Sequence, residues 1–75
     1  MARTVDIGER IAELREERAL TQVELAKKAG ISPSTLSLLE SGKVERPHVS
    51  TIRKISRVLG VEPQELRATP KVLAP

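Results

Sequence analysis

The sequence predicts one all-α domain of five short helices, and three of its properties support this fold class. Its 75 residues are too few for more than one hydrophobic core. It contains no Phe, Trp, Tyr or Cys, so the core must consist of aliphatic side chains without a disulfide. Aliphatic side chains interdigitate well between helices, whereas sheets of this size usually depend on aromatic residues. The apolar residues also recur at helical spacing between capping and turn-forming residues.

Capping boxes predict the starts of the first two helices. In such a box a Ser, Thr or Asp side chain accepts from a free backbone N–H, and a Glu three residues later reaches back. One box spans 6–9 and opens a helix expected over 7–18. A second box spans 21–24 and opens a short helix that Gly30 ends, because glycine readily takes the left-handed conformation. The apolar positions expected in these two helices are Ile7, Ile11, Leu14, Val23, Leu25, Ala26 and Ala29.

Three further helices follow from local signals. Ser32 is a good N-cap and precedes a proline, which is tolerated at a first helical position, so a third helix is expected over 33–41. Residues 43–47 form a loop, because the proline that ends this segment disfavours helix before it. A fourth helix is expected over 49–59 and a fifth over 63–66. The apolar stripe of the fourth helix is expected to be Val49, Ile52, Ile55 and Leu59.

The formal net charge of +3 is unevenly distributed along the chain. Residues 41–60 contain five basic side chains and one acidic side chain. Such a stretch suits an anionic partner, with nucleic acid ahead of a membrane surface. No apolar run approaches the ~20 residues of a membrane span, no export leader is recognisable, and cysteine is absent. We therefore expect a cytoplasmic protein without a membrane partner.

The segment 24–39 has the layout of a helix-turn-helix unit, two short helices joined by a glycine-containing turn. The second helix of this unit is the third predicted helix of the chain. At about 100° per residue, its Leu36 and Leu39 share one face. A helix that enters the DNA major groove needs a narrow outer face, and serines meet the steric part of this need. A merely solvated face is the alternative, although other exposed faces here are rich in Glu, Lys and Arg. The outer face would consist of Ser34, Ser37, Leu38 and Ser41.

Several motifs occur at fixed spacing along most of the chain. They are Arg10-Ile11, Leu14-Arg15, Leu20-Thr21-Gln22-Val23-Glu24-Leu25-Ala26, Ala29-Gly30-Ile31-Ser32, Ser34-Thr35-Leu36-Ser37, Leu39-Glu40-Ser41-Gly42-Lys43, Pro47, Ile52, Ile55, Leu59-Gly60-Val61 and Leu66. On these motifs the sequence resembles the Cro/CI-type (XRE-type) helix-turn-helix domains of bacterial and phage repressors. The resemblance implies a compact five-helix lambda-repressor-like fold whose third helix is the recognition helix. Residues 1–67 are expected to form this DNA-binding domain, and residues 68–75 a flexible C-terminal tail.

The resemblance also implies roles for individual residues. Gln22, at the start of the second helix, matches a glutamine that hydrogen-bonds a DNA phosphate, and a helix N-terminus already favours an anion. Arg15 and Glu40 match a structural ion pair between the first and third helices. The residues that match contacts to bases or to the adjoining backbone are Ser32, Pro33, Ser34, Ser37 and Leu38. The residues that match phosphate contacts in the following loop are Lys43 and Arg46.

Three positions depart from the family pattern. Pro33 and Ser34 stand where a long polar residue is common, and Leu38 stands where Gln or Arg often reads a base. Leu38 either contacts a thymine methyl group or acts as a spacer. Sequence readout then rests on Ser34, Ser37 and the shape of the DNA.

The resemblance implies a sequence-specific DNA-binding transcriptional regulator, expected to repress, whose third helix enters the major groove of a near-palindromic operator. Double-stranded DNA is the expected partner, bound by a homodimer with contacts around Val58, Val61, Leu66 and 72–73. The alternative is an antitoxin- or coactivator-like interaction module on the same fold, with a toxin or another protein as partner. No enzymatic activity, cofactor or metal is expected, because His48 lacks a second ligand and the paired carboxylates lie on solvated faces. The expected location is the nucleoid of a bacterial cell, whether the protein is bacterial or phage-encoded.

Overall fold

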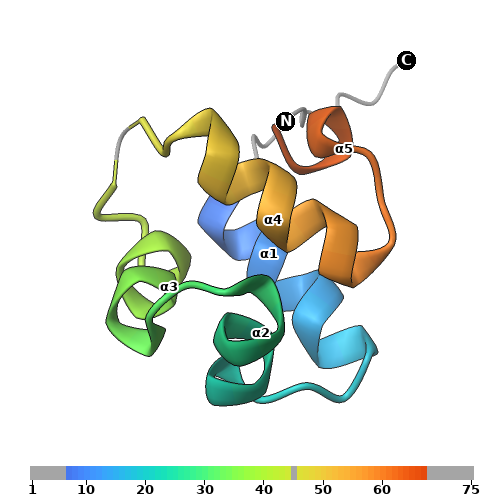
Figure 1. Cartoon of the computed structure of the whole chain (residues 1–75). Coiled ribbons are helices and arrows are strands. Elements are labelled where there is room, and N and C mark those ends of the chain that lie inside the picture. The colour runs from blue at the N-terminus through green and yellow to red at the C-terminus, as the bar shows by residue number, and fades with distance from the viewer. Residues whose placement is uncertain (1–6, 45, 68–75) are drawn as a thin grey trace, which may run out of the picture.

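The computed structural model describes residues 7–44 and 46–67. This part of the chain contains five α-helices. They are α1 (Ile7–Glu17), α2 (Gln22–Ala29), α3 (Pro33–Glu40), α4 (Val49–Leu59) and α5 (Pro63–Arg67). The predicted all-α class is confirmed (Figure 1). Helix α4 has the predicted ends, whereas α1 and α3 end one residue earlier and α5 one residue later than predicted. Asp6 of the first capping box and the tail expected at 68–75 lie outside the described residues.

Local capping determines where α2 and α3 begin. The Glu24 backbone N–H donates to Thr21 Oγ1 at 3.0 Å, and the Thr21 backbone N–H donates to Glu24 Oε1 at 2.8 Å. This is the second predicted capping box. At the start of α3, the Thr35 backbone N–H donates to Ser32 Oγ at 3.1 Å, and Pro33 occupies the first helical position. Both helices therefore begin at residues that satisfy otherwise free N–H groups.

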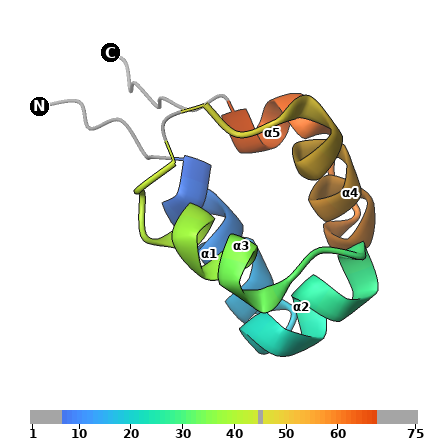
Figure 2. The ribbon, with the colours of Figure 1, turned by 60° about the vertical axis from the view of Figure 1, so that its left-hand side comes forward.

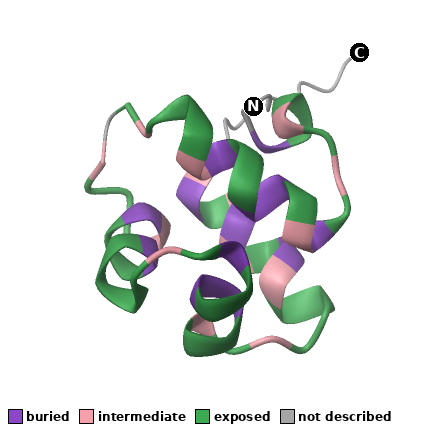
Figure 3. Cartoon of the chain, viewed as in Figure 1, coloured by how far each residue is buried: buried purple, intermediate pink, exposed green. Residues whose placement is uncertain are grey.

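The core is one cluster of aliphatic side chains to which all five helices contribute (Figure 3). Helix α1 packs against α3 and α5, α2 packs against α3 and α4, and α4 also packs against α5. Helices α2 and α3 lie together, and α5 lies at the opposite end of the molecule from α2 (Figures 1 and 2). The buried apolar residues are Ile11, Leu14, Leu25, Ala26, Ala29, Leu36, Leu39, Ile52, Ile55, Leu59 and Leu66.

Three apolar residues differ from their expected places. Val23 is expected on the apolar face of α2 but is 60% exposed, because it lies about 200° around the helix from Leu25. Val49 is expected in the apolar stripe of α4 but is 51% exposed. It is the first residue of α4, and helical side chains tilt toward the N-terminus, so it projects past the core. Leu66 is expected at a dimer interface but is completely buried, so it is not available for a dimer contact.

Candidate nucleic-acid interface

The turn between α2 and α3 sets the geometry of the helix-turn-helix unit. Gly30 has a φ of +74°, and the backbone N–H of Ile31 donates to the carbonyl of Ala26 at 3.0 Å. A Cβ at Gly30 would meet no atom within 4 Å. Backbone conformation, rather than crowding, therefore makes glycine the favoured residue at this point. The turn and the packing of α2 on α3 together hold α3 with one face outward.

The outward face of α3 is exposed and uncharged. Leu36 and Leu39 are 0% and 3% exposed and attach α3 to the core. Glu40 is the single charged residue of α3, and it bonds inward to Arg15 of α1. Leu38 is 48% exposed, which makes it the one large apolar side chain on this face. All five residues to which the resemblance assigns base or adjoining backbone contacts are exposed here: Ser32, Pro33, Ser34, Ser37 and Leu38.

The loop after α3 adds positive charge beside this face. Lys43 and Arg46, for which phosphate contacts are expected, are both exposed. A hollow of about 200 Å³ connects the loop with α3, since Thr35 of α3 lines it together with Arg46 and His48. Thr35 is a residue of this surface that the sequence analysis misses. Its position in the first turn of α3 could have indicated a place on this surface. Its hydroxyl lies 2.9 Å from Ser32 Oγ.

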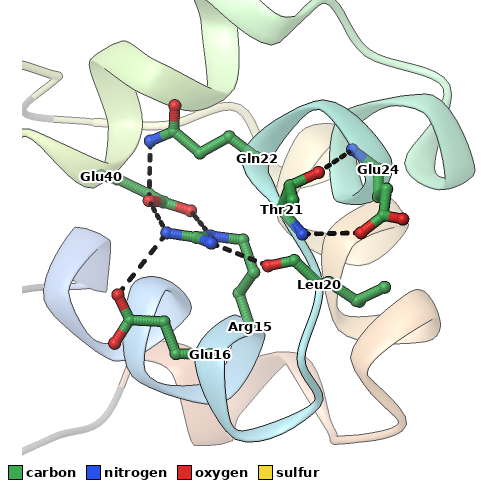
Figure 4. A network of polar contacts seen from close by, with 7 residues as sticks. All are labelled: Arg15, Glu16, Leu20, Thr21, Gln22, Glu24 and Glu40. Atoms are coloured by element: carbon green, nitrogen blue, oxygen red, sulfur yellow. Dashed lines mark hydrogen bonds and ion pairs between the residues drawn. The ribbon is translucent and has the colours of Figure 1, made fainter.

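An ion pair joins α1 to α3 behind the outward face (Figure 4). Arg15 Nε donates to Glu40 Oε2 at 2.8 Å, and Arg15 Nη2 donates to Glu40 Oε1 at 3.0 Å. The pair expected from the resemblance is therefore present and bidentate. The two side chains are 13% and 6% exposed. The hydrogen bond to Glu40 raises the pKa of Arg15 above its ordinary value, against the opposing effect of burial, and the nearby negative charges raise it further.

Gln22 belongs to the same network. It is the first residue of α2 and is half-buried. Its side-chain Nε2 donates to Glu40 Oε1 at 2.9 Å (Figure 4). The sequence does not predict this contact, because only a phosphate is expected there as the partner of Gln22. The structure thus brings Gln22, Arg15 and Glu40 together at the start of α2, while the other expected site residues lie on α3, on its N-cap and in the following loop.

Within residues 7–44 and 46–67, no three His, Asp or Glu side chains are grouped in a way that could hold a metal ion. The helices in those ranges also lack the length and apolar character of a membrane span. His48 is the N-cap of α4, makes no side-chain capping bond, and is exposed in the wall of the hollow beside α3.

Most of this chain is similar in sequence to known helix-turn-helix proteins. Residues 11–66 match the helix-turn-helix family. The HTH-type transcriptional regulator RghRB of Bacillus subtilis is 43% identical over 61 residues, which are 81% of this chain and 44% of RghRB. The immunity repressor of Bacillus phage phi105 is 41% identical over 56 residues, which are 75% of this chain and 38% of the repressor. The chain thus spans less than half the length of either relative.

Solved structures give the same result. SinR of Bacillus subtilis, solved in complex with DNA, superposes with a TM-score of 0.80 at 37% identity, covering 83% of this chain and 98% of that chain. SinR has also been solved in a complex with the SinI protein. These similarities confirm the lambda-repressor-like fold, and the similar proteins are regulators rather than enzymes. The chain belongs to the Cro/CI-type (XRE-type) helix-turn-helix family.

Proposed function

We propose that this protein is a transcriptional repressor that binds a near-palindromic operator through a DNA-binding domain of residues 1–67, with α3 in the major groove. The observation that carries the proposal is the outward face of α3, which is exposed, uncharged and mostly lined by serines, with basic side chains at its edge. A major groove about 12 Å wide admits a helix of this kind. The basic edge suits the phosphates on either side of the groove. The proposed site of action is the nucleoid in the cytoplasm.

The proposed interface makes two classes of contact, one to the edges of the bases and one to the phosphate backbone. Ser34 and Ser37 present hydroxyls that donate to or accept from base edges, and Leu38 offers an apolar contact to a thymine methyl group. Lys43 and Arg46 contact the phosphate backbone. Gln22 and the N-terminus of α2 hold a further phosphate, since a helix N-terminus favours an anion. Ser32 and Pro33 complete the surface at the N-terminus of α3.

A homodimer accounts for the expected symmetry of the operator. Two copies related by a two-fold axis place their α3 helices in successive major grooves about 34 Å apart. Val58 lies in the last turn of α4, and Val61 lies in the link from α4 to α5. Both are half-buried in the single chain and are the proposed dimer contacts. Residues 72–73, expected to assist, lie outside the described residues.

Selection of bound DNA from a random library tests the proposal. We expect enrichment of an inverted repeat with half-sites about 34 Å apart. Binding to the selected DNA should weaken as salt rises, with a log–log slope of about −0.9 for each phosphate contacted. A salt-independent affinity, or a library without enrichment from a folded protein, contradicts the proposal.

Two variants with the same charge change show where the DNA lies. Lys43→Ala/Arg46→Ala removes two positive charges beside α3, whereas Arg53→Ala/Arg57→Ala removes two charges from α4, where they line a hollow together with Val61. The first variant should reduce the salt slope by about two and weaken binding about tenfold or more. The second should leave the slope nearly unchanged. Equal losses in both variants, with both proteins in the wild-type oligomeric state by analytical ultracentrifugation, would mean that net charge, and not the α3 face, governs binding.

One observation favours an alternative function. Leu38 is an exposed apolar side chain on α3, and such a residue also suits a protein partner. In this alternative, the chain is an antitoxin- or coactivator-like module that binds a toxin or another protein. Gln22→Ala/Lys43→Ala separates the two functions. It should abolish DNA retention under the first and leave capture of a protein partner intact under the second.

A further inference from the structure

We infer that Glu40 and Arg15 position the side chain of Gln22 for a DNA phosphate, in addition to joining α1 to α3. The inference rests on the proposed function. Gln22 Nε2 and Arg15 Nη2 donate to the same atom, Glu40 Oε1, at 2.9 and 3.0 Å (Figure 4). A carboxylate that accepts from Arg15 cannot donate, so the NH2 end of the Gln22 amide must face it. The orientation of this amide is therefore fixed before any DNA binds.

The bond to Glu40 uses only one of the two N–H groups on Gln22 Nε2. Within the described part of the chain, no other acceptor for this side chain is found. Gln22 is the first residue of α2, directly after the N-cap Thr21. The remaining N–H therefore belongs to a helix end at which an anion is already favoured.

Arg15 holds the acceptor of Gln22 in place. Besides its two bonds to Glu40, it donates from Nη1 to the carbonyl of Leu20 at 2.8 Å, just before α2. One guanidinium thus fixes both the backbone that leads into α2 and the carboxylate that orients Gln22. Arg15 also offsets the negative charge of Glu40, which alone would repel a phosphate at this end of α2.

Fixing the side chain in advance favours binding. A glutamine that is already held in one orientation loses less rotamer freedom when it meets a phosphate than a freely rotating one. The contribution of Gln22 to DNA affinity should then depend on the pair behind it. The contribution of Lys43 should not, because its side chain is exposed and makes no bond to the network.

A double-mutant cycle measures this dependence on the selected operator. Gln22→Ala should weaken binding about five- to tenfold in the wild-type background, the loss expected when one typical hydrogen bond is removed. In an Arg15→Met/Glu40→Met background, which removes the acceptor without leaving an unpaired charge, Gln22→Ala should weaken binding less than about twofold. Lys43→Ala is the matched control and should have the same effect in both backgrounds. Far-UV circular dichroism checks that each variant is folded.

A second measurement needs only the wild-type protein. The chain contains two glutamines, Gln22 and Gln64, and no asparagine, so only two side-chain carboxamide NH2 groups appear in its NMR spectrum. Gln64 is exposed on α5 and serves as the mobile reference. In the free protein, the Nε2 order parameter of Gln22 should be about 0.8, close to that of rigid backbone, and that of Gln64 below about 0.6. Equal mobility of the two side chains overturns the inference.

The outcomes distinguish the inference from the function on which it rests. If the wild type selects an operator but Gln22→Ala weakens binding equally in both backgrounds, the positioning role is wrong and the proposed function stands. If the wild type selects no DNA, the proposed function fails and the phosphate role of Gln22 fails with it. Loss of Gln22 dependence, unchanged Lys43 dependence and a rigid Gln22 amide together support the inference.

Discussion

Replacing Arg15 by Met should destabilise the fold strongly. The change removes two charge-assisted bonds to Glu40 and one bond to the Leu20 carbonyl, and it leaves a 6% exposed carboxylate without its counter-ion. Removing one partner of a buried ion pair costs about 3–5 kcal/mol. At about 0.05–0.15 kcal/mol per residue, a chain of 75 residues has a total stability of about 4–11 kcal/mol. Subtracting this cost leaves about 0–8 kcal/mol, so we expect this variant to unfold at a much lower urea concentration than the wild type.

Adding Glu40→Met to that variant should recover most of the loss. The second substitution removes the unpaired carboxylate of Glu40. It also places an apolar side chain of similar volume against the methionine introduced at position 15. Because well-packed apolar replacements of buried ion pairs are often nearly neutral, we expect the double variant within about 2 kcal/mol of the wild type. The second substitution is therefore stabilising in the presence of the first, although Glu40→Met alone should be destabilising.

Urea unfolding followed by far-UV circular dichroism measures both effects. Intrinsic fluorescence cannot be used, since the chain contains no Trp or Tyr. Each variant should retain the wild-type m value, the slope of the free energy of unfolding against urea concentration. Differences in the urea midpoint then report differences in stability. A stability of Arg15→Met within about 1 kcal/mol of the wild type would show that the ion pair does not hold α1 to α3. A double variant less stable than Arg15→Met would show that the unpaired Glu40 carboxylate is not the source of the loss.

Three further predictions concern pH, backbone strain and readout. Contact with Glu40 raises the pKa of Arg15 in the folded protein. The stability that the charged Arg15 contributes is therefore complete below its unfolded pKa and is lost only as the pH rises through the still higher folded pKa. Arg15→Met should thus lower the free energy of unfolding by the same amount at about pH 7 and about pH 9. Ala19 has a φ of +57°, so Ala19→Gly should raise stability by about 1 kcal/mol, and Gly30→Ala, at φ +74° with free space around it, should lower it by about 1 kcal/mol in thermal unfolding. If Leu38 contacts a thymine methyl, replacing operator thymines by deoxyuridine should weaken wild-type binding about two- to fivefold and leave Leu38→Ala unaffected; a wild type insensitive to every such replacement identifies Leu38 as a spacer.

The features that sequence reasoning predicts well are those set by neighbours along the chain. The capping box at Thr21 and Glu24 and the left-handed Gly60 act within a few residues, so α2 and α4 could be placed from the sequence. The positive φ of Ala19 could not, because no glycine marks it. It lies in the loop that the bond from Arg15 to the Leu20 carbonyl holds.

The candidate site divides in the same way. The exposed face of α3 follows from helical periodicity once Leu36 and Leu39 are assigned to the core. The bond between Gln22 and Glu40 joins residues 18 apart and depends on how α2 crosses α3. No periodicity within either helix encodes that crossing, because the aliphatic core sets it.

The uncharged character of the α3 face depends on a residue that lies outside it. Glu40 ends α3, where a solvated carboxylate would meet both the negative end of the helix dipole and the DNA phosphates. Arg15 prevents both effects, because it holds Glu40 at 6% exposure and offsets its charge. We therefore expect Arg15 to affect the affinity of the proposed DNA interface without touching DNA. After correction for the unfolded fraction, Arg15→Met should still weaken operator binding, whereas Lys43→Ala should weaken binding with no change in stability; if the corrected affinity of Arg15→Met equals that of the wild type, the pair serves folding alone.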